Sequence, residues 1–321
     1  MKNKLLIMLS VSALLSVNST ALLHAEENDT YTVGICQYVQ HEALDLATEG
    51  FKTALTDALG DRVSFEEGNA QGDSGTCTLI INDLITKEVD LILANATTAL
   101  QAAVTGTADI PILGTSVTEY GAALQIDDFA GTVGGNVSGT SDLAPLEVQA
   151  AMIKELFPDA ASVGLLYCSA EPNSLYQINV VKKELEALGY TPLVYTFADS
   201  YDITSVTMKA ASECEVIYVP TDNMVASNAE LIANVCIPEQ IPVIAGEENS
   251  CKVCGAATFS IDYYDLGYVT GEMAVRILTE GEDISTMPIE YADVFTKQYN
   301  PEICSALGID VPADYEALEM E

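Results

Sequence analysis

The sequence predicts an α/β protein of two similar lobes, each built on a parallel sheet, because the same order of segments occurs twice. In each copy, short apolar runs end abruptly in small polar residues and precede helical patterns. The matched runs are 33–35 with 163–165, 89–98 with 214–223, and 110–113 with 241–244, at offsets of 130, 125 and 131 residues. Two Rossmann-like lobes suit a chain of 321 residues better than one core does.

An apolar leader precedes the first copy. Lys2 and Lys4 come before the apolar segment 5–17, and a small residue, Ala25, ends the stretch. This order is typical of a secretory signal over residues 1–25, whereas an uncleaved membrane anchor needs roughly 18 or more apolar residues. No cysteine precedes Cys36, so the lipid-attachment cysteine of many exported binding proteins is missing. We therefore expect an exported protein, periplasmic or extracellular at the cell surface, without that anchor.

The first lobe follows from hydrophobic spacing. Apolar residues alternate or run continuously in the expected strands and recur every three or four positions in the expected helices. The helix before the third strand should turn Leu79, Leu84 and Ile85 inward. The elements expected are strands over 31–36, 63–67 and 91–94 and helices over 44–59 and 99–104.

Three crossings should join the lobes. The polar, glycine-rich stretch 131–142 predicts a flexible link before a helix over 145–156, in which Pro145 suits the first turn. Further crossings are expected at 259–262 and from Pro288 onward, which makes a hinge of three segments. The expected division is 26–142 plus about 262–288 for lobe 1, and 143–261 plus part of about 289–321 for lobe 2.

The chain is strongly acidic, with 12 basic against 48 acidic residues and a formal net charge of −36. Without the two leader lysines the charge is −38. Nucleic acids and anionic membranes are disfavoured as partners, because their phosphates need clustered Lys and Arg. Only Arg62 and Arg276 occur, far from the strand ends, so a dianionic ligand is also disfavoured.

Most of the eight cysteines lie in apolar runs, where buried free thiols are expected. Cys251 and Cys254 form a CxxC pair in an expected loop, which favours a small local disulfide. No second pair stands at metal spacing, and the two histidines are His24 in the leader and His41 in a loop, so a zinc site is not expected.

Polar side chains gather at the expected carboxyl ends of the strands, where open parallel sheets bind ligands. Hydroxyls and backbone N–H groups there suit a carboxylate, and Asp222 and Glu247 suit an ammonium group, so the set predicts a site for a zwitterion. For Thr98 alone, a helix-capping role is an equal alternative. The candidate residues are Gln37, Thr97, Thr98, Ser116, Thr118, Glu171, Asn173, Ser174, Thr221, Asp222, Asn223 and Glu247.

Catalytic motifs are missing. The sequence holds no GxSxG elbow, no phosphate loop and no histidine near a candidate nucleophile. Carboxylate pairs such as Glu247 and Glu248 are expected by chance among 48 acids. We therefore expect a binding protein without cofactor or metal, and an extracellular hydrolase remains a weaker alternative.

An ordered set of motifs resembles the TrpX-like family of ABC transporter substrate-binding proteins over essentially the whole mature chain. The sequence departs from the family at Glu42, Thr98 and Glu119-Tyr120. The resemblance implies a type I periplasmic binding protein fold and an ABC permease as partner, and some members bind aromatic amino acids. The motifs are 71–73, 97–101, 136–142, 171–174, 220–223, 246–247 and 262–267.

The function expected is that of a monomeric receptor that closes on a small zwitterion, an aromatic or other apolar amino acid, and delivers it to the permease. Ser116, Thr118 and Thr98 would take the carboxylate, and Asp222 with Glu171 or Glu247 the ammonium group. The alternative is a sugar or nucleoside receptor of the same fold. Tyrosines that could stack on an aromatic ligand, although packing roles are the simpler reading, are Tyr38, Tyr120 and Tyr263.

Overall fold

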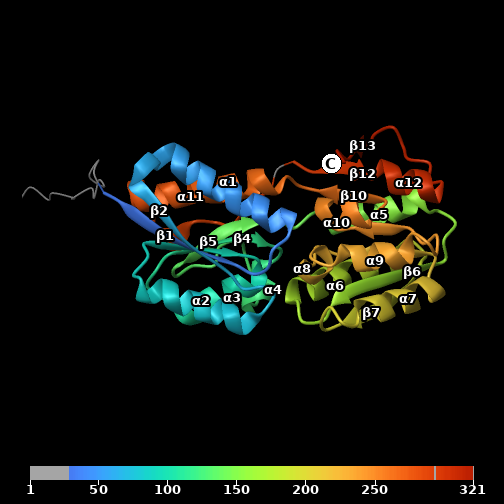
Figure 1. Cartoon of the computed structure of the whole chain (residues 1–321), viewed down its shortest axis with the longest axis horizontal. Helices are drawn as coiled ribbons and strands as arrows, with labels where there is room; N and C mark the ends of the chain where they lie inside the picture. Colours follow the sequence, from blue (N-terminus) through green and yellow to red (C-terminus); the bar gives the residue numbers. More distant parts are fainter. Residues whose placement is uncertain (1–28, 293, 321) are drawn as a thin grey trace, which may run out of the picture.

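The computed structural model describes residues 29–292 and 294–320. The predicted signal segment, 1–25, lies outside this range. Figure 1 shows two α/β lobes side by side along the long axis of the molecule, each with a central sheet. No helix in the described part of the chain is long and apolar enough to cross a bilayer.

The first sheet has six parallel strands, and its buried central strands are rich in Ile, Leu and Val as parallel sheets require. The predicted strands at 31–36, 63–67 and 91–94 are confirmed. In spatial order the strands are β11 (Glu290–Tyr291), β5 (Val137–Ser141), β4 (Ile112–Val117), β3 (Leu91–Asn95), β1 (Tyr31–Gln37) and β2 (Val63–Asn69).

The second sheet has seven strands, parallel except that β12 runs antiparallel to β10. The repeated pattern in the sequence therefore corresponds to two sheets with the same central order. Its strands, in spatial order, are β13 (Glu316–Ala317), β12 (Thr296–Tyr299), β10 (Ala257–Ser260), β9 (Val243–Ala245), β8 (Val216–Val219), β6 (Ser162–Cys168) and β7 (Thr191–Phe197).

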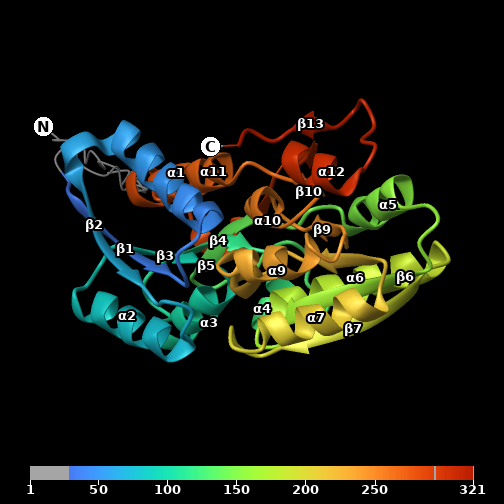
Figure 2. The same ribbon diagram turned by 45° about the vertical axis from the view of Figure 1, so that its right-hand side comes forward.

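Helices cover both faces of the first sheet, as Figure 2 shows. On one face α1 and α11 bury Phe51, Leu55 and Met273. On the other face α2 and α3 bury Ile81, Leu84 and other apolar side chains. A turn of π-helix over Arg276–Glu280 extends α11. The helices are α1 (Glu42–Leu59), α2 (Ser74–Thr86), α3 (Thr97–Gly106), α4 (Tyr120–Leu124) and α11 (Tyr263–Val275), with 3-10 turns at Gly60–Arg62 and Ile284–Thr286.

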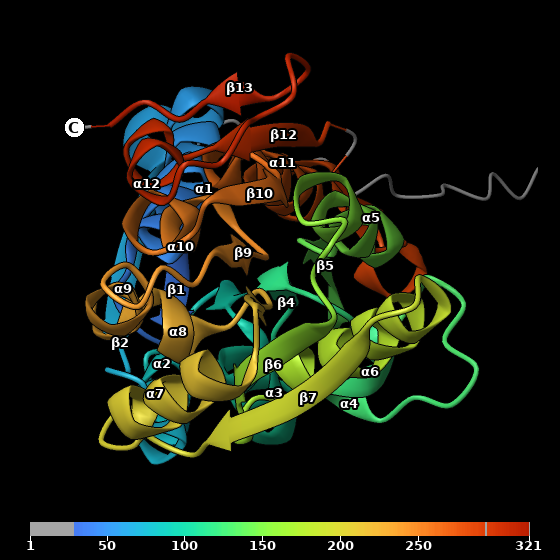
Figure 3. The same ribbon diagram turned by 90° about the vertical axis from the view of Figure 1, so that its right-hand side faces the viewer.

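The second sheet is covered in the same way, with α5 and α6 on one face and α7 and α9 on the other (Figure 3). The short helices α8 and α10 begin where β8 and β9 end. The helices are α5 (Leu146–Leu156), α6 (Pro172–Ala187), α7 (Ile203–Glu213), α8 (Asn223–Ala226), α9 (Ala229–Cys236), α10 (Glu248–Val253) and α12 (Pro301–Leu307).

The chain passes between the two sheets three times. It leaves the first sheet after β5, returns from β10 to α11, and leaves again between β11 and β12. The returning helix α11 packs closely on α1: a Cβ at Gly267 would lie 2.0 Å from the carbonyl oxygen of Ala47, and one at Gly50 would lie 2.1 Å from that of Tyr264. Glycine is therefore needed at both positions for the two helices to approach this far.

Several local predictions were wrong. Leu79 is 70% exposed, because Cys77 and Ile81 occupy the inward face of α2 instead. The stretch expected to be a flexible link contains β5, whose five residues are all buried. Pro145 is the N-cap residue of α5, one position before its first turn.

The predicted disulfide between Cys251 and Cys254 is also wrong. Cys251 lies within α10 and Cys254 caps its carboxyl end, so the pair is not in an open loop. Both are free and buried, as are the other six cysteines. Burial raises the pKa of both thiols, which keeps them protonated.

Candidate ligand-binding site between the lobes

The site lies where the loops after the strands of one sheet meet those of the other. His41, which follows β1, contacts Asn223, which follows β8, at 3.2 Å. Tyr38 from the same β1 loop lies close to Glu171 after β6: burial raises the pKa of Tyr38, and the nearby Glu171 carboxylate raises it further. The carboxyl ends of both sheets therefore form one shared interface.

Glu171 lies between the end of β6 and the start of α6, at the carboxyl edge of the second sheet. Its Oε2 accepts hydrogen bonds from the backbone N–H of Asn223, the side chain of Asn223 and the side chain of Asn173, and its Oε1 accepts one from the N–H of Met224. Burial and the neighbouring Asp222 carboxylate raise the pKa of Glu171 to about 8. Its hydrogen bonds hold the start of α8 against the loop after β6.

Asp222 caps α8 from the other side. Its Oδ1 accepts from the N–H of Val225 at 2.9 Å, and its Oδ2 accepts from the N–H of Cys168 at 2.7 Å and the hydroxyl of Ser174 at 2.8 Å. Both oxygens thus already have donors within the lobe, and burial raises the pKa of the carboxyl. This is an N-cap role, which the capping sequence Thr-Asp-Asn before a short helix could have indicated.

Glu247 plays the same part at α10. Its two carboxylate oxygens accept from the N–H groups of Ser250 at 2.5 Å and Asn249 at 2.7 Å. The side chain is buried, and burial raises its pKa. All three acidic candidates of the second lobe therefore bind helix N-termini.

Asn223 connects Glu171 of the second lobe to His41 of the first lobe through hydrogen bonds. Asn223 donates its amide N–H to Glu171 at 2.7 Å, which leaves its Oδ1 as the acceptor for His41 Nε2–H. Burial lowers the pKa of His41 to about 4, so the ring is neutral at pH 7. The lone pair on its Nδ1 then has no hydrogen-bond donor among residues 29–292 and 294–320.

Ser116 is held in a strained conformation at the end of β4. Its φ of 53° lies in the left-handed region, which a non-glycine residue adopts rarely. Its hydroxyl is buried and has no partner among the described residues. Ala96, at the end of the neighbouring β3, has a φ of 85°, so two adjacent strands end in unusual backbone conformations at this edge.

Asp142 follows β5 directly and is buried. Its Oδ2 accepts from the hydroxyl of Tyr263 at 3.0 Å, and the side chain of Thr118 lies near the carboxyl. Its Oδ1 has no hydrogen-bond partner among the described residues. Burial raises the pKa of Asp142 to about 6. Sequence reasoning missed this residue, because it ends a polar stretch that reads as a flexible link.

Hydrogen-bonding atoms without partners are concentrated at this interface. A buried polar atom that stays unsatisfied costs about 1–3 kcal/mol, so such atoms are rare unless a ligand or water completes them. Eight buried side-chain atoms lack a partner in the described chain, and five of them belong to residues of the facing loops and helix starts. Those five are His41 Nδ1, Ser116 Oγ, Asp142 Oδ1, Asn173 Oδ1 and Ser250 Oγ.

The remaining candidates have varied surroundings. Gln37 bonds only within lobe 1, to Val39, Asp45 and Thr48. Thr97 is buried and Thr98 half-buried at the first positions of α3, whose N-terminus suits an anion. The hydroxyl of Thr221 donates to the carbonyl of Gly246 at 3.3 Å.

Two of the three tyrosines are held by hydrogen bonds. Tyr120 is fully buried in the core of lobe 1 and donates to the carbonyl of Thr140 at 3.0 Å, so it packs there rather than at the interface. Tyr263 is buried at the second crossing, where its hydroxyl holds Asp142. Tyr38 lies beside the Glu171 and Asp222 carboxylates, and its hydroxyl has no hydrogen-bond partner among the described residues.

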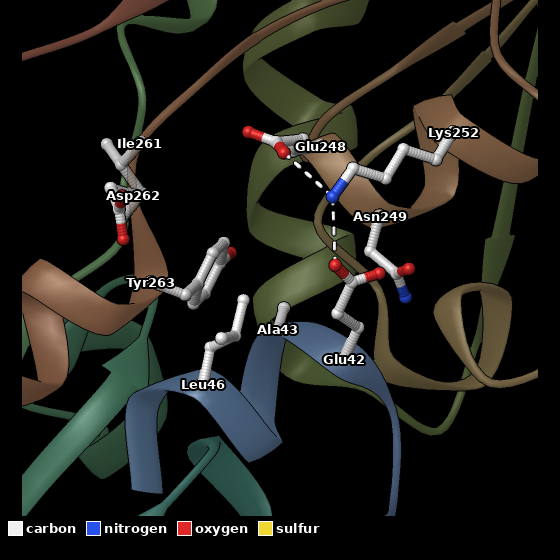
Figure 4. Close-up of a pocket in the computed structure, with 9 residues that line it drawn as sticks. All are labelled: Glu42, Ala43, Leu46, Glu248, Asn249, Lys252, Ile261, Asp262 and Tyr263. Atoms are coloured by element: carbon white, nitrogen blue, oxygen red, sulfur yellow. Dashed lines mark hydrogen bonds and ion pairs between the residues drawn. The ribbon is translucent and has the colours of Figure 1, made fainter. Parts of the chain in front are cut away.

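Figure 4 shows a small cavity on the hinge side of this interface, where Lys252 reaches between Glu42 and Glu248. Its volume is about 60 Å³. Ligand pockets typically span roughly 300–1,000 Å³, so this cavity is not the site of an amino acid. It marks a gap beside Tyr263 and Leu46 where the lobes meet.

Two lobes of this topology, joined by three crossings and carrying unsatisfied polar atoms where their strands end, define a solute-binding protein of the periplasmic type I fold. The sequence profile of ABC transporter substrate-binding proteins matches residues 32–318. The chain belongs to this family, whose members are extracytoplasmic, bind a small-molecule substrate without converting it and work with an ABC permease.

Three relatives carry further information. The chain is 33% identical over 280 residues to a tyrosine-binding protein of Clostridioides difficile, which covers 86% of this chain and 81% of the relative. It is 29% identical to a solved ABC domain from Streptococcus pneumoniae in complex with L-Trp, with a TM-score of 0.85 over 89% of this chain and 97% of the other. It is 33% identical to a ligand-free, open substrate-binding protein with adhesive properties from Clostridium difficile, with a TM-score of 0.70 over 91% and 100%.

The arrangement of the lobes resembles the tryptophan complex more than the open structure. The open protein has the higher sequence identity but the lower TM-score. Sequence divergence therefore does not explain the lower TM-score of the open structure. The contact between His41 and Asn223 across the interface agrees with a closed arrangement.

Proposed function

We propose that this protein is the receptor of an ABC importer and binds an aromatic amino acid between its lobes. The observation that carries the proposal is the cluster of buried, unpartnered polar atoms at the interface of the described lobes, in a fold that matches the tryptophan complex with a TM-score of 0.85. A zwitterion offers both an acceptor and a donor for such atoms. A relative that is named as tyrosine-binding supports the aromatic class.

The low number of arginines also supports a ligand without a second negative charge. Arg276 is engaged by Glu282 at 2.9 Å and by Glu290 at 2.6 Å. Sugar-binding structures of the same fold share 15% identity or less with this chain and indicate the fold alone. The sugar or nucleoside alternative is therefore an outcome of the test and has no observation in its favour.

A thermal-shift screen tests the proposal. The chain from residue 26 is unfolded, dialysed to remove any bound ligand, refolded, and screened against the twenty L-amino acids, common sugars and nucleosides. A ligand at 100 times its Kd should stabilise the protein by about 2.7 kcal/mol, which raises the Tm measurably. We expect L-tyrosine, L-tryptophan or L-phenylalanine to raise it most. A shift with sugars or nucleosides alone would overturn the proposal.

The import role has its own test. A strain that lacks the gene should take up radiolabelled ligand more slowly than its parent, and a plasmid copy should restore the rate. Unchanged uptake in the deletion strain, with binding intact in the purified protein, would make this a receptor for another purpose.

A further inference from the structure

Four buried carboxylates lie at the interface between the lobes, and their hydrogen bonds distinguish them. Glu171, Asp222 and Glu247 each accept a backbone N–H on both carboxylate oxygens. The donors lie at helix starts, except for Cys168, which is the last residue of β6. Their negative charge is thus directed at helix N-termini, which stabilise it. Asp142 is the exception, because its Oδ1 has no hydrogen-bond partner in the described part of the chain.

No cationic side chain of the described residues contacts the Asp142 carboxyl. The hydroxyl of Tyr263 bonds to the carboxyl and the side chain of Thr118 lies near it, and neither is a cation. Tyr120 also lies near it, from the start of α4. Across the hinge, Glu247 and Thr221 lie close to the Tyr263 hydroxyl. A buried carboxylate in such surroundings needs a cationic partner to be favourable in its charged form.

The position of Asp142 fits a zwitterion. It follows β5, and Ser116 ends the neighbouring β4, where the two strands pair through Val117 and Ser141. The unpartnered oxygen of Asp142 and the unpartnered hydroxyl of Ser116 therefore come from adjacent strand ends. One can accept from an ammonium group while the other donates to a carboxylate.

We propose that Asp142, in place of Asp222, binds the ammonium group of the ligand, an inference that rests on the proposed function. Tyr263 is then a positioning residue, because its hydroxyl holds Oδ2 at 3.0 Å and leaves Oδ1 for the ligand. Since Tyr263 starts α11 at the second crossing, the ammonium site is connected directly to the hinge. Asp222 keeps its role as the cap of α8.

Matched pairs of ligands test the assignment. L-tyrosine is compared with 3-(4-hydroxyphenyl)propanoate, and L-tryptophan with indole-3-propanoate, by isothermal titration at pH 8. Each analogue lacks only the amino group. Asp142→Asn should weaken binding of the amino acid by at least about 30-fold, since truncating a buried charge pair is this costly. It should leave binding of the analogue within about threefold of wild type.

Asp222→Asn is the control. It should alter binding of the amino acid and of the analogue by the same factor, because its oxygens serve the protein rather than the ligand. Asp142→Ser is a second variant that removes the carboxylate and still offers Tyr263 an acceptor, in case the asparagine variant does not fold.

The outcomes separate the two proposals. If the wild-type protein binds amino acids but the Asp142 variants lose the amino acid and the analogue equally, Asp142 is structural and this inference fails alone. If Asp222→Asn selectively loses the amino acid, the ammonium site belongs to Asp222. If the wild-type protein binds no amino acid, the proposed function fails and this inference fails with it.

Discussion

The ammonium group of Lys252, in the last turn of α10, lies 2.8 Å from the carboxylate of Glu42, the first residue of α1. Among the ion pairs of the described residues, this pair is the one that joins the two lobes. Lys252 also contacts Glu248 of its own lobe at 3.0 Å. Because both lobes are acidic, this lysine offsets like-charge repulsion that opposes closure.

Lys252→Met and Glu42→Gln should each raise the Kd for the ligand by about two- to fivefold, the range expected for a partly exposed ion pair. Most of the change should be a faster dissociation rate in stopped-flow measurements. The double variant should bind about as weakly as Lys252→Met alone, and 1 M NaCl should reduce the difference.

Lys297→Met is a matched control for removal of the ion pair between Lys252 and Glu42. Lys297 pairs with Glu155 and Asp314 inside the second lobe, so its removal should leave the Kd unchanged. Additive effects of the Lys252 and Glu42 changes would contradict a direct pair.

Asp142→Asn should stabilise the ligand-free protein at alkaline pH. Burial raises the pKa of Asp142 from 3.8 to about 6, so the folded state binds this proton more tightly than the unfolded state does. The resulting stability is complete below pH 3.8 and is lost as the pH rises through 6. Asparagine never ionises and escapes this loss, which is about 3 kcal/mol above pH 7.

Urea unfolding at pH 5 and pH 8 measures this effect. The difference in unfolding free energy between Asp142→Asn and wild type should shift in favour of the variant by about 1–2 kcal/mol from pH 5 to pH 8. Glu171, Asp222 and Glu247 also titrate with raised pKa values, but they do so in both proteins. A difference that stays constant with pH would show that Asp142 is ionised freely in the folded state.

Asp222→Asn should destabilise the protein by about 1–3 kcal/mol. An amide nitrogen in place of one carboxylate oxygen would face the N–H of Cys168 and the hydroxyl of Ser174, or the N–H of Val225. Chemical denaturation measures the loss. Asp202→Asn is its control, because Asp202 precedes α7 without a side-chain cap bond and should change stability little.

The eight cysteines should be unreactive in the native protein and reactive after unfolding. All eight are buried free thiols. A thiol reagent such as DTNB should therefore label almost none in buffer and eight in guanidinium chloride without reductant. Six labelled thiols after unfolding would reinstate the local disulfide of Cys251 and Cys254.

Strands with a strong apolar pattern were predictable, and those shaped by their neighbours were not. Leu91–Asn95 and Val216–Val219 are apolar runs bounded by polar residues, and both are central strands. Val137–Ser141 is a strand although it is rich in small polar residues. The close approach of β4 requires a small residue there, because a Cβ at Gly139 would lie 2.1 Å from the Gly114 carbonyl oxygen. Such contacts between distant segments leave no local pattern.

The positions of the candidate residues at strand ends were predictable from the sequence, and their hydrogen-bond partners were less so. Ser116, Thr118, Glu171 and Asp222 do lie at strand ends near the facing lobe, because the α/β topology places them there. Their partners depend on which helix start each one reaches, and the order of residues does not reveal this. Asp142 was overlooked for the same reason that β5 was.

The close packing of α11 on α1 has a consequence for biosynthesis. The first lobe takes helix α11 and strand β11 from the far end of the chain, after the whole second sheet except its last two strands has been made. A ribosome must therefore reach residue 291 before lobe 1 has all its parts. The last contacts of lobe 1 therefore form only when nearly the whole chain has been synthesised.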